Sequence, residues 1–211
     1  MAEKQTEGDL DLEASISRPS KSEDHMSPTE KSLPILFAVV IAGFFLLYSF
    51  STSSLKVHVT DASLAQFNHT TNNGQLHYNL ALNISIRNPN TMIGLFYDTI
   101  EAKGYYQDRI FGNVSLPVFY QGHKNRSVLS PVFHGQRLFW LTNSEISNFD
   151  SETSDGVYSF ELILVLKGTA KAEYWFKTAH FQLAYVCALQ VPLTSTGKSA
   201  DQTTPCQCYY F

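Results

Sequence analysis

The sequence lacks the motifs on which most enzyme classes depend. Its 211 residues contain no Gly-x-Ser-x-Gly string, no phosphate-binding loop, no dinucleotide fingerprint and no His-Glu-x-x-His pair. Its seven histidines are scattered along the chain rather than grouped in one motif. These absences argue against the common hydrolases, nucleotide-binding proteins and metalloproteases. We therefore predict a protein that is not an enzyme and needs no cofactor.

Charge is absent from one stretch, which runs from Leu33 to Phe50. As a helix, its 18 residues would extend about 27 Å, close to the roughly 30 Å of a bilayer's hydrocarbon core. Pro34 falls in the first turn, where its missing N–H costs little, and Tyr48 falls where interfacial aromatic residues gather. A long polar segment precedes the stretch and no small-residue cleavage site ends it, which argues against a removed signal peptide. We predict that residues 32–50 form a transmembrane signal anchor.

The first 31 residues lack aromatic side chains and cysteine. They hold eight acidic side chains against four basic ones, while the remainder carries eleven of each, so the whole net charge of −4 lies here. Such a segment cannot bury enough apolar surface to offset its conformational entropy. We predict that residues 1–31 form a disordered acidic tail in the cytosol. Its acidity argues against binding to nucleic acid, and its lack of cysteine leaves no site for a palmitoyl anchor.

Four Asn-x-Ser/Thr sequons follow the predicted span, and none has proline at its middle position. Sequons are glycosylated only on the lumenal or extracellular side of a membrane, whereas the basic residues flanking the span give a weak orientation signal. We therefore predict a cytosolic N terminus and an extracellular C-terminal domain. The expected location is the plasma membrane, with plasmodesmata as a further candidate. The predicted glycosylation sites are Asn68, Asn83, Asn113 and Asn125.

Cysteine is scarce as well, since only Cys187, Cys206 and Cys208 are present. All three lie on the predicted extracellular side, where disulfides persist. In an extended strand Cys206 and Cys208 point to the same face, and a bond between them would close a small strained ring. We predict a disulfide from Cys187 to Cys206 or Cys208, with one thiol left over. A metal site is not expected, because no second ligand pair lies near the Cys-x-Cys string.

Beyond the span, residues 51–211 are long enough for one domain with its own core. From Leu76 to Ile86 apolar and polar residues alternate, which is the period of a half-buried antiparallel strand. Turn signals such as Asn72-Asn73-Gly74 and Lys167-Gly168 separate the strands. Further β-type runs are expected at Leu55–Leu64, Met92–Tyr106, Ile110–Tyr120, Val128–Trp140, Val157–Leu166, Ala170–Trp175 and Phe181–Leu193.

This succession of short strands predicts an all-β domain, either a two-sheet sandwich or a barrel. One short helix is expected over Asn143–Ser151, capped by Thr142 or Asn143, with Ile146 and Phe149 on one face. The last four residues, Cys208 to Phe211, fit a prenylation box only loosely, and we predict that they form a closing strand.

Two motifs carry a family resemblance. They contain Asn88, Pro89, Asn90, Gly94, Tyr97 and Asp98, and then Pro117, Phe119, Tyr120, Gln121, Gly122, His123 and Lys124. With the single span and the late Cys187, these strings closely resemble the signature of the plant non-race-specific disease resistance and harpin-induced-like (NHL) family. The resemblance covers roughly residues 33–211 and implies a group 2 late embryogenesis abundant (LEA-2) domain. That domain is a two-sheet antiparallel β-sandwich, similar to immunoglobulin and fibronectin type III domains, with a short helix.

Both motifs have features of turns. Pro89 cannot donate to a strand ladder, Asn side chains can replace missing backbone partners, and Gly94 permits a bulge or a close approach. Two interpretations follow. Either the motifs only hold the strands in register, or Tyr120, Gln121, His123 and Lys124 recognise a partner.

The resemblance implies a role in plant defence and stress responses, through signalling or membrane–wall contact. The partner would then be a protein receptor or a cell-wall polymer, although the sequence has no Arg-Gly-Asp adhesion string and its tail departs from the family pattern. The alternative is a membrane-anchored module that binds or tethers lipid. It is favoured by the 15 Phe and 11 Tyr residues, since a sandwich can open an apolar groove between its sheets. The sequence does not indicate an oligomeric state.

Overall fold

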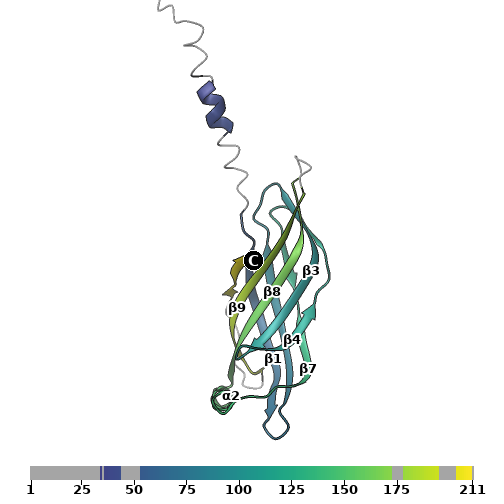
Figure 1. Cartoon of the computed structure of the whole chain (residues 1–211), viewed down its shortest axis with the longest axis vertical. Helices are drawn as coiled ribbons and strands as arrows, with labels where there is room; N and C mark the ends of the chain where they lie inside the picture. Colours follow the sequence, from purple (N-terminus) through teal and green to yellow (C-terminus); the bar gives the residue numbers. More distant parts are fainter. Residues whose placement is uncertain (1–33, 35, 44–52, 173–177, 195–202, 211) are drawn as a thin grey trace, which may run out of the picture. The chain divides into compact units, whose positions relative to one another are not determined.

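The computed structural model describes residues 34, 36–43, 53–172, 178–194 and 203–210 (Figure 1). The chain divides into two compact units, Met1–Ser51 and Thr52–Phe211. In the first unit, the described residues 34 and 36–43 are helical. No helix within the described ranges is both long and apolar enough to cross a membrane. The predicted tail and the rest of the predicted span, including residues 44–50, lie outside those ranges.

The second unit is built from two antiparallel sheets, which confirms the prediction of an all-β sandwich. In the first, which we call the β2 sheet, the described strands are β10 (Thr204–Pro205), β1 (Lys56–Thr70), β2 (Gln75–Arg87), β6 (Arg126–Leu129) and β7 (Val132–Leu138). In the second, the β8 sheet, they are β11 (Gln207–Tyr210), β9 (Thr178–Pro192), β8 (Val157–Ala172), β3 (Ile93–Tyr106), β4 (Arg109–Ser115) and β5 (Tyr120–Gln121). Both β6 and β7 pair with β2, and β5 pairs with β3.

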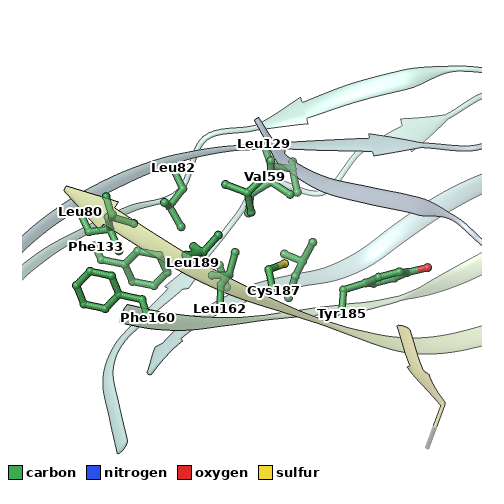
Figure 2. Packing of buried hydrophobic residues seen from close by; sticks show 14 of the residues in the cluster. Val59, Leu80, Leu82, Leu129, Phe133, Phe160, Leu162, Tyr185, Cys187 and Leu189 are labelled. Carbon is green, nitrogen blue, oxygen red and sulfur yellow. The ribbon is translucent and has the colours of Figure 1, made fainter. Parts of the chain in front are cut away.

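The core lies between the two sheets. Strands place alternate side chains on opposite faces, so the apolar residues of each sheet point toward the other. Figure 2 shows Val59, Leu80 and Leu129 of the β2 sheet facing Leu162 and Leu189 of the β8 sheet. All five are buried members of one continuous cluster. This inward packing follows the period-two pattern seen in the sequence.

Helix α2 (Asn143–Asp155) closes one end of the sandwich, which we call the distal end. Its N-cap is Thr142, which forms a capping box with Glu145, and Gly156 ends it in the left-handed conformation. The predicted helix is confirmed and extends four residues beyond its predicted end at Ser151. Phe149 of the helix packs on Phe67, whose ring is surrounded by the aromatic side chains of Tyr106, Phe111, Phe149, Tyr158 and Phe160 at centroid distances of 4.9–5.9 Å.

The turn predicted at Lys167-Gly168 is wrong, because β8 runs unbroken from Val157 to Ala172. Gly168 is needed for another reason. A Cβ atom there would collide with the backbone carbonyl oxygen of Phe96 on the neighbouring strand. The ladder between β3 and β8 shifts register beside it, between Tyr97 and Thr99. The glycine therefore marks a bulge with close backbone contact, which a sequence pattern does not distinguish from a turn.

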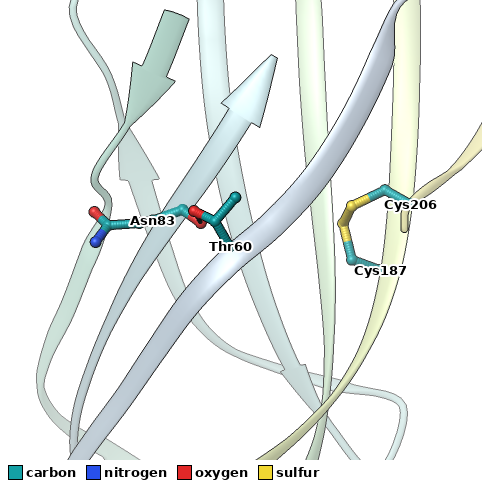
Figure 3. The surroundings of a disulfide bond; sticks show 4 residues. All are labelled: Thr60, Asn83, Cys187 and Cys206. Atoms are coloured by element: carbon teal, nitrogen blue, oxygen red, sulfur yellow. Dashed lines mark hydrogen bonds between the residues drawn. A yellow bond between two sulfur atoms is a disulfide. The ribbon is translucent and has the colours of Figure 1, made fainter. Parts of the chain in front are cut away.

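Two other predicted strands are each divided. Ile110–Tyr120 becomes β4 and β5, and Val128–Trp140 becomes β6 and β7 around Pro131, whose carbonyl accepts a hydrogen bond from the Leu82 N–H. The chain passes from the β8 sheet to the β2 sheet between β5 and β6. It returns to the β8 sheet between β7 and β8, where α2 lies. It crosses from the β2 sheet to the β8 sheet again between β10 and β11, where the structure joins Cys206 to Cys187 of β9 by a disulfide (Figure 3).

The close contact at Gly168 predicts that a larger residue there will destabilise the domain. Replacing Gly168 with Ala should lower the free energy of unfolding by about 1–3 kcal/mol, because the new methyl group must displace backbone rather than a flexible side chain. Gly122→Ala is the matched control, since nothing lies within 4 Å of a Cβ built there. Its unfolding free energy should change by less than about 0.5 kcal/mol. Equal urea midpoints for the two variants would contradict this account of the bulge.

Candidate recognition site at the proximal end

The two sequence motifs meet at the end of the sandwich opposite α2, which we call the proximal end. It comprises the segment from Ser53 to Lys56, the β2–β3 loop from Asn88 to Met92, and the β5–β6 turn from Gly122 to Asn125. Backbone hydrogen bonds join the loop and the turn directly. The Asn88 N–H donates to the Asn125 carbonyl, and the Lys124 N–H donates to the Asn90 carbonyl, both at 2.9 Å. Motifs that begin 29 residues apart in the sequence thus form one structural unit.

Asn88 connects the loop to the turn through its side chain. It is fully buried, and its amide donates to the carbonyls of Ile93 at 2.8 Å and Gly122 at 3.1 Å. Its Oδ1 accepts from the backbone and the side-chain amide of Asn90. Asn90 in turn exchanges two hydrogen bonds with the backbone of Ser53, at 2.9 and 3.0 Å. This network also holds the point at which the chain begins the domain.

Gln121 spans the interior between the two sheets. It is fully buried, and its Nε2 donates to the Ile86 carbonyl on β2 at 2.9 Å and to Ser127 Oγ at 3.2 Å. Its Oε1 accepts a 2.8 Å hydrogen bond from the Tyr97 hydroxyl on β3. Burial raises the pKa of Tyr97 well above its ordinary value, so the phenol remains protonated and remains a donor. Gln121 therefore has a structural role and is not available to a partner.

The remaining motif residues divide by exposure. Phe119 packs on Tyr97 with centroids 4.8 Å apart, while Asp98 and Pro117 are exposed and Pro89 is partly buried. Tyr120 is 49% exposed, and its ring lies over Gly94, where a Cβ atom would collide with it. The close approach predicted at Gly94 is thus made by an aromatic ring. His123 and Lys124 are exposed in the turn, and Lys124 adopts a φ of 51°.

A pocket of about 230 Å³ opens beside this network. Its lining is mostly apolar and comes from the β8 sheet, from the β2–β3 loop and from the start of the domain: Ser53, Ser54, Leu55, Asn90, Ile93, Leu95, Ala170, Phe181 and Leu183. Of these residues, only Asn90 was among the candidates from sequence. The others were missed because alternating apolar residues look the same whether they fill the core or line a pocket.

The predicted glycosylation sites differ in accessibility. Asn68, Asn113 and Asn125 are exposed. Asn83 is partly buried, donates to Asp61 at 3.2 Å, and accepts from Ser130 at 2.7 Å. Figure 3 shows its place on β2 next to Thr60 of β1, whose hydroxyl donates to the Asn83 carbonyl.

The cysteines resolve the alternatives left open by the sequence. The structure pairs Cys187 with Cys206 and leaves Cys208 as a partly buried free thiol. Over the described part of the chain, no group of three His, Cys, Asp or Glu side chains lies close enough to hold a metal ion.

Sequence comparison defines first the class of protein. Residues 83–187 match the family model of the late embryogenesis abundant protein (LEA_2), and this stretch includes both motifs and most strands of the sandwich. Among solved structures, a protein from Archaeoglobus fulgidus covers 67% of this chain and 97% of its own at 10% identity. Its TM-score is 0.28, too low to carry an argument.

The particular family follows from three Arabidopsis thaliana relatives. NDR1/HIN1-like protein 3 is 39% identical over 80% of this chain and 72% of its own length. NDR1/HIN1-like protein 10 is 44% identical over 62% of this chain and 57% of its own, and NDR1/HIN1-like protein 2 is 35% identical over 75% and 66%. The chain thus belongs to the NDR1/HIN1-like family, as the two motifs indicated. It spans 57–72% of the length of these relatives.

The buried pair of Tyr97 and Gln121 makes a second prediction. Tyr97→Phe and Gln121→Met should each lower the unfolding free energy by about 1–3 kcal/mol, because each leaves buried polar atoms without partners. The double variant should lose less unfolding free energy than the two single variants lose together, because each single substitution already breaks the hydrogen bond between Tyr97 and Gln121. Urea unfolding of the wild type, the two single variants and the double variant gives the four free energies of this double-mutant cycle.

Tyr120→Phe serves as the control for that cycle. The Tyr120 hydroxyl belongs to a half-exposed ring on the outer surface, so its removal should change the unfolding free energy by less than about 0.5 kcal/mol. Strict additivity of the two buried substitutions would show that Gln121 does not couple the sheets.

Proposed function

We propose that this protein is a non-enzymatic, single-pass plasma-membrane protein of plant defence and stress responses. Its acidic tail lies in the cytosol and its sandwich lies outside the cell, where the domain supports signalling or membrane–wall contact. The observation that carries the proposal is the Cys187–Cys206 disulfide in a domain that also exposes Asn68, Asn113 and Asn125 within sequons. Disulfides and N-glycans both belong to the secretory compartment.

The arrangement of the motif residues supports contact rather than catalysis. The polar side chains that converge at the proximal end, Asn88, Asn90, Tyr97 and Gln121, satisfy one another and the backbone. A catalytic group needs a hydrogen-bonding position open to substrate. The surface around this network, with Tyr120, His123 and Lys124, is therefore the part that meets a partner.

Endoglycosidase treatment tests the topology. Protein made in plant cells should lose apparent mass on treatment, and the shift should disappear when Asn68, Asn83, Asn113 and Asn125 are all replaced by Gln. In sealed microsomes, an epitope at the N terminus should be digested by added protease while the domain is protected. Protection of the N-terminal epitope instead would reverse the proposed orientation.

A second function, lipid binding within the domain, is favoured by the pocket at the proximal end. Its volume of about 230 Å³ and the apolar side chains of Ile93, Leu95, Phe181 and Leu183 suit part of an acyl chain. The polar side chains of Ser53, Ser54 and Asn90 in its lining can contact the polar end of such a ligand. This function is compatible with a role in membrane contact.

Native mass spectrometry of the purified protein tests lipid binding. The wild-type protein should retain a co-purifying lipid, and Ala170→Phe should abolish it by filling the pocket. Ala188→Phe is the matched control, because Ala188 is exposed on β9 and does not line the pocket. Lipid retention by the Ala170 variant, or its absence from the wild type, would exclude this second function.

A further inference from the structure

Three cations lie side by side on the outer face of the β2 sheet at the proximal end. The strand register places Lys56 of β1 opposite Arg87 of β2, and Arg87 opposite Arg126 of β6. All three side chains are exposed. We call this group the cationic row. Exposed Lys124 stands two residues before its last member, so the positive charge continues into the β5–β6 turn.

The cationic row is not neutralised by nearby carboxylates in the described part of the chain. The ion pairs found there, Lys103 with Glu101 on β3 and Arg109 of β4 with Glu145 of α2, lie elsewhere in the domain. Like charges directly opposite each other in a sheet are destabilising. Their mutual contact therefore does not stabilise the fold, and an anionic partner would relieve their repulsion.

Exposed apolar side chains occupy the other face of the same end. Phe96 of β3 is 44% exposed and Tyr120 of β5 is 49% exposed, and their rings lie 4.5 Å apart. Met92, in the loop before β3, is 38% exposed. Two packed sheets are separated by only about 10 Å, so the row and these apolar side chains border the same narrow end of the domain. Aromatic and basic side chains together are typical of protein surfaces at a lipid–water interface.

The distal end has the opposite charge. Helix α2 carries four carboxylates, on Glu145, Asp150, Glu152 and Asp155, and no basic residue. Figure 1 shows α2 and the β1–β2 turn at the far end of the long strands. From Lys56 to His69, which contacts Phe149 of α2, β1 extends roughly 43 Å. The domain therefore has a charge polarity along its length that orients it in front of an anionic surface.

We propose that the proximal end docks on the phospholipid headgroups of the membrane that holds the anchor. Lys56, Arg87 and Arg126 contact lipid phosphates, while Met92, Phe96 and Tyr120 enter the interfacial layer. The inference rests on the proposed membrane anchor, whose predicted end at Phe50 is six residues before Lys56. Six residues reach at most about 20 Å, so the row stays within a short distance of the bilayer whatever path the chain takes.

The alternative partner, an acidic wall polysaccharide, fits the geometry less well. A polymer that approaches from the wall first meets the distal end, where α2 presents its carboxylates. The cationic row adjoins Leu55 and Ser54, next to the point at which the chain leaves for the membrane. The exposed apolar side chains of Met92, Phe96 and Tyr120 lie at the same end of the domain, so their position also favours lipid as the partner.

Hydrogen exchange of the full chain in lipid nanodiscs tests the docking. In discs of phosphatidylcholine with about 30% phosphatidylserine, we expect amides of residues 88, 90–92 and 122–125 to exchange about threefold more slowly in the wild type than in Lys56→Ser/Arg126→Ser. Raising the ionic strength from about 0.05 M to about 0.5 M should remove most of this difference. Tyr120→Ser should reduce the protection that remains at high salt.

Lys103→Ser/Arg137→Ser is the matched control, because it removes one Lys and one Arg from other parts of the domain. It should exchange like the wild type. The Lys56→Ser/Arg126→Ser variant should also remain folded, because the two substitutions remove the positive charges opposite Arg87.

Equal exchange rates in the wild type and the Lys56/Arg126 variant would overturn the docking. Protection of the same amides by added oligogalacturonate, but not by lipid, would also overturn it. Failure of the chain to enter the discs would instead contradict the anchor itself.

Discussion

The structure depends on one constraint: a chain that passes between two packed sheets must satisfy its polar groups without water. At the proximal end, Gln121 meets this constraint by bonding to Ile86 in one sheet and to Tyr97 in the other. Asn88 does the same for the loop and the turn that flank the passage. A buried amide without such partners would cost more than its bonds contribute, so each member depends on the others. This mutual dependence sets the register of β2, β3, β5 and β6.

The same constraint divides the family motifs between structure and surface. The side chains of Asn88, Tyr97 and Gln121 are buried and form their hydrogen bonds inside the sandwich. Tyr120, His123 and Lys124 are exposed on its surface. The structural interpretation therefore holds for Asn88, Tyr97 and Gln121, whereas recognition of a partner by Tyr120, His123 and Lys124 stays a prediction. A polar residue in such a motif is not by itself a contact residue.

The two ends of the domain differ in structure. Aromatic rings around Phe67, covered by α2, close the distal end, whereas the proximal end keeps a pocket, a row of cations and exposed apolar side chains. The disulfide and the pairing of β10 with β1 and of β11 with β9 hold the C-terminal strands to the same framework. The contact with a membrane surface that we propose uses the open, charged end.

The sequence by itself determined the all-β class, the place of the helix and the family, while the choice of Thr142 over Asn143 as its cap came from the structure. These depend on periodicity, capping and local motifs, which involve residues close together in the chain. Only the tertiary structure decided the unbroken β8, the pairing of Cys187 with Cys206 rather than Cys208, and the meeting of the two motifs. It also brought Lys56, Arg87 and Arg126 into one row. Each of these depends on which strands become neighbours, and that is set by packing across the core rather than by any local pattern of residues.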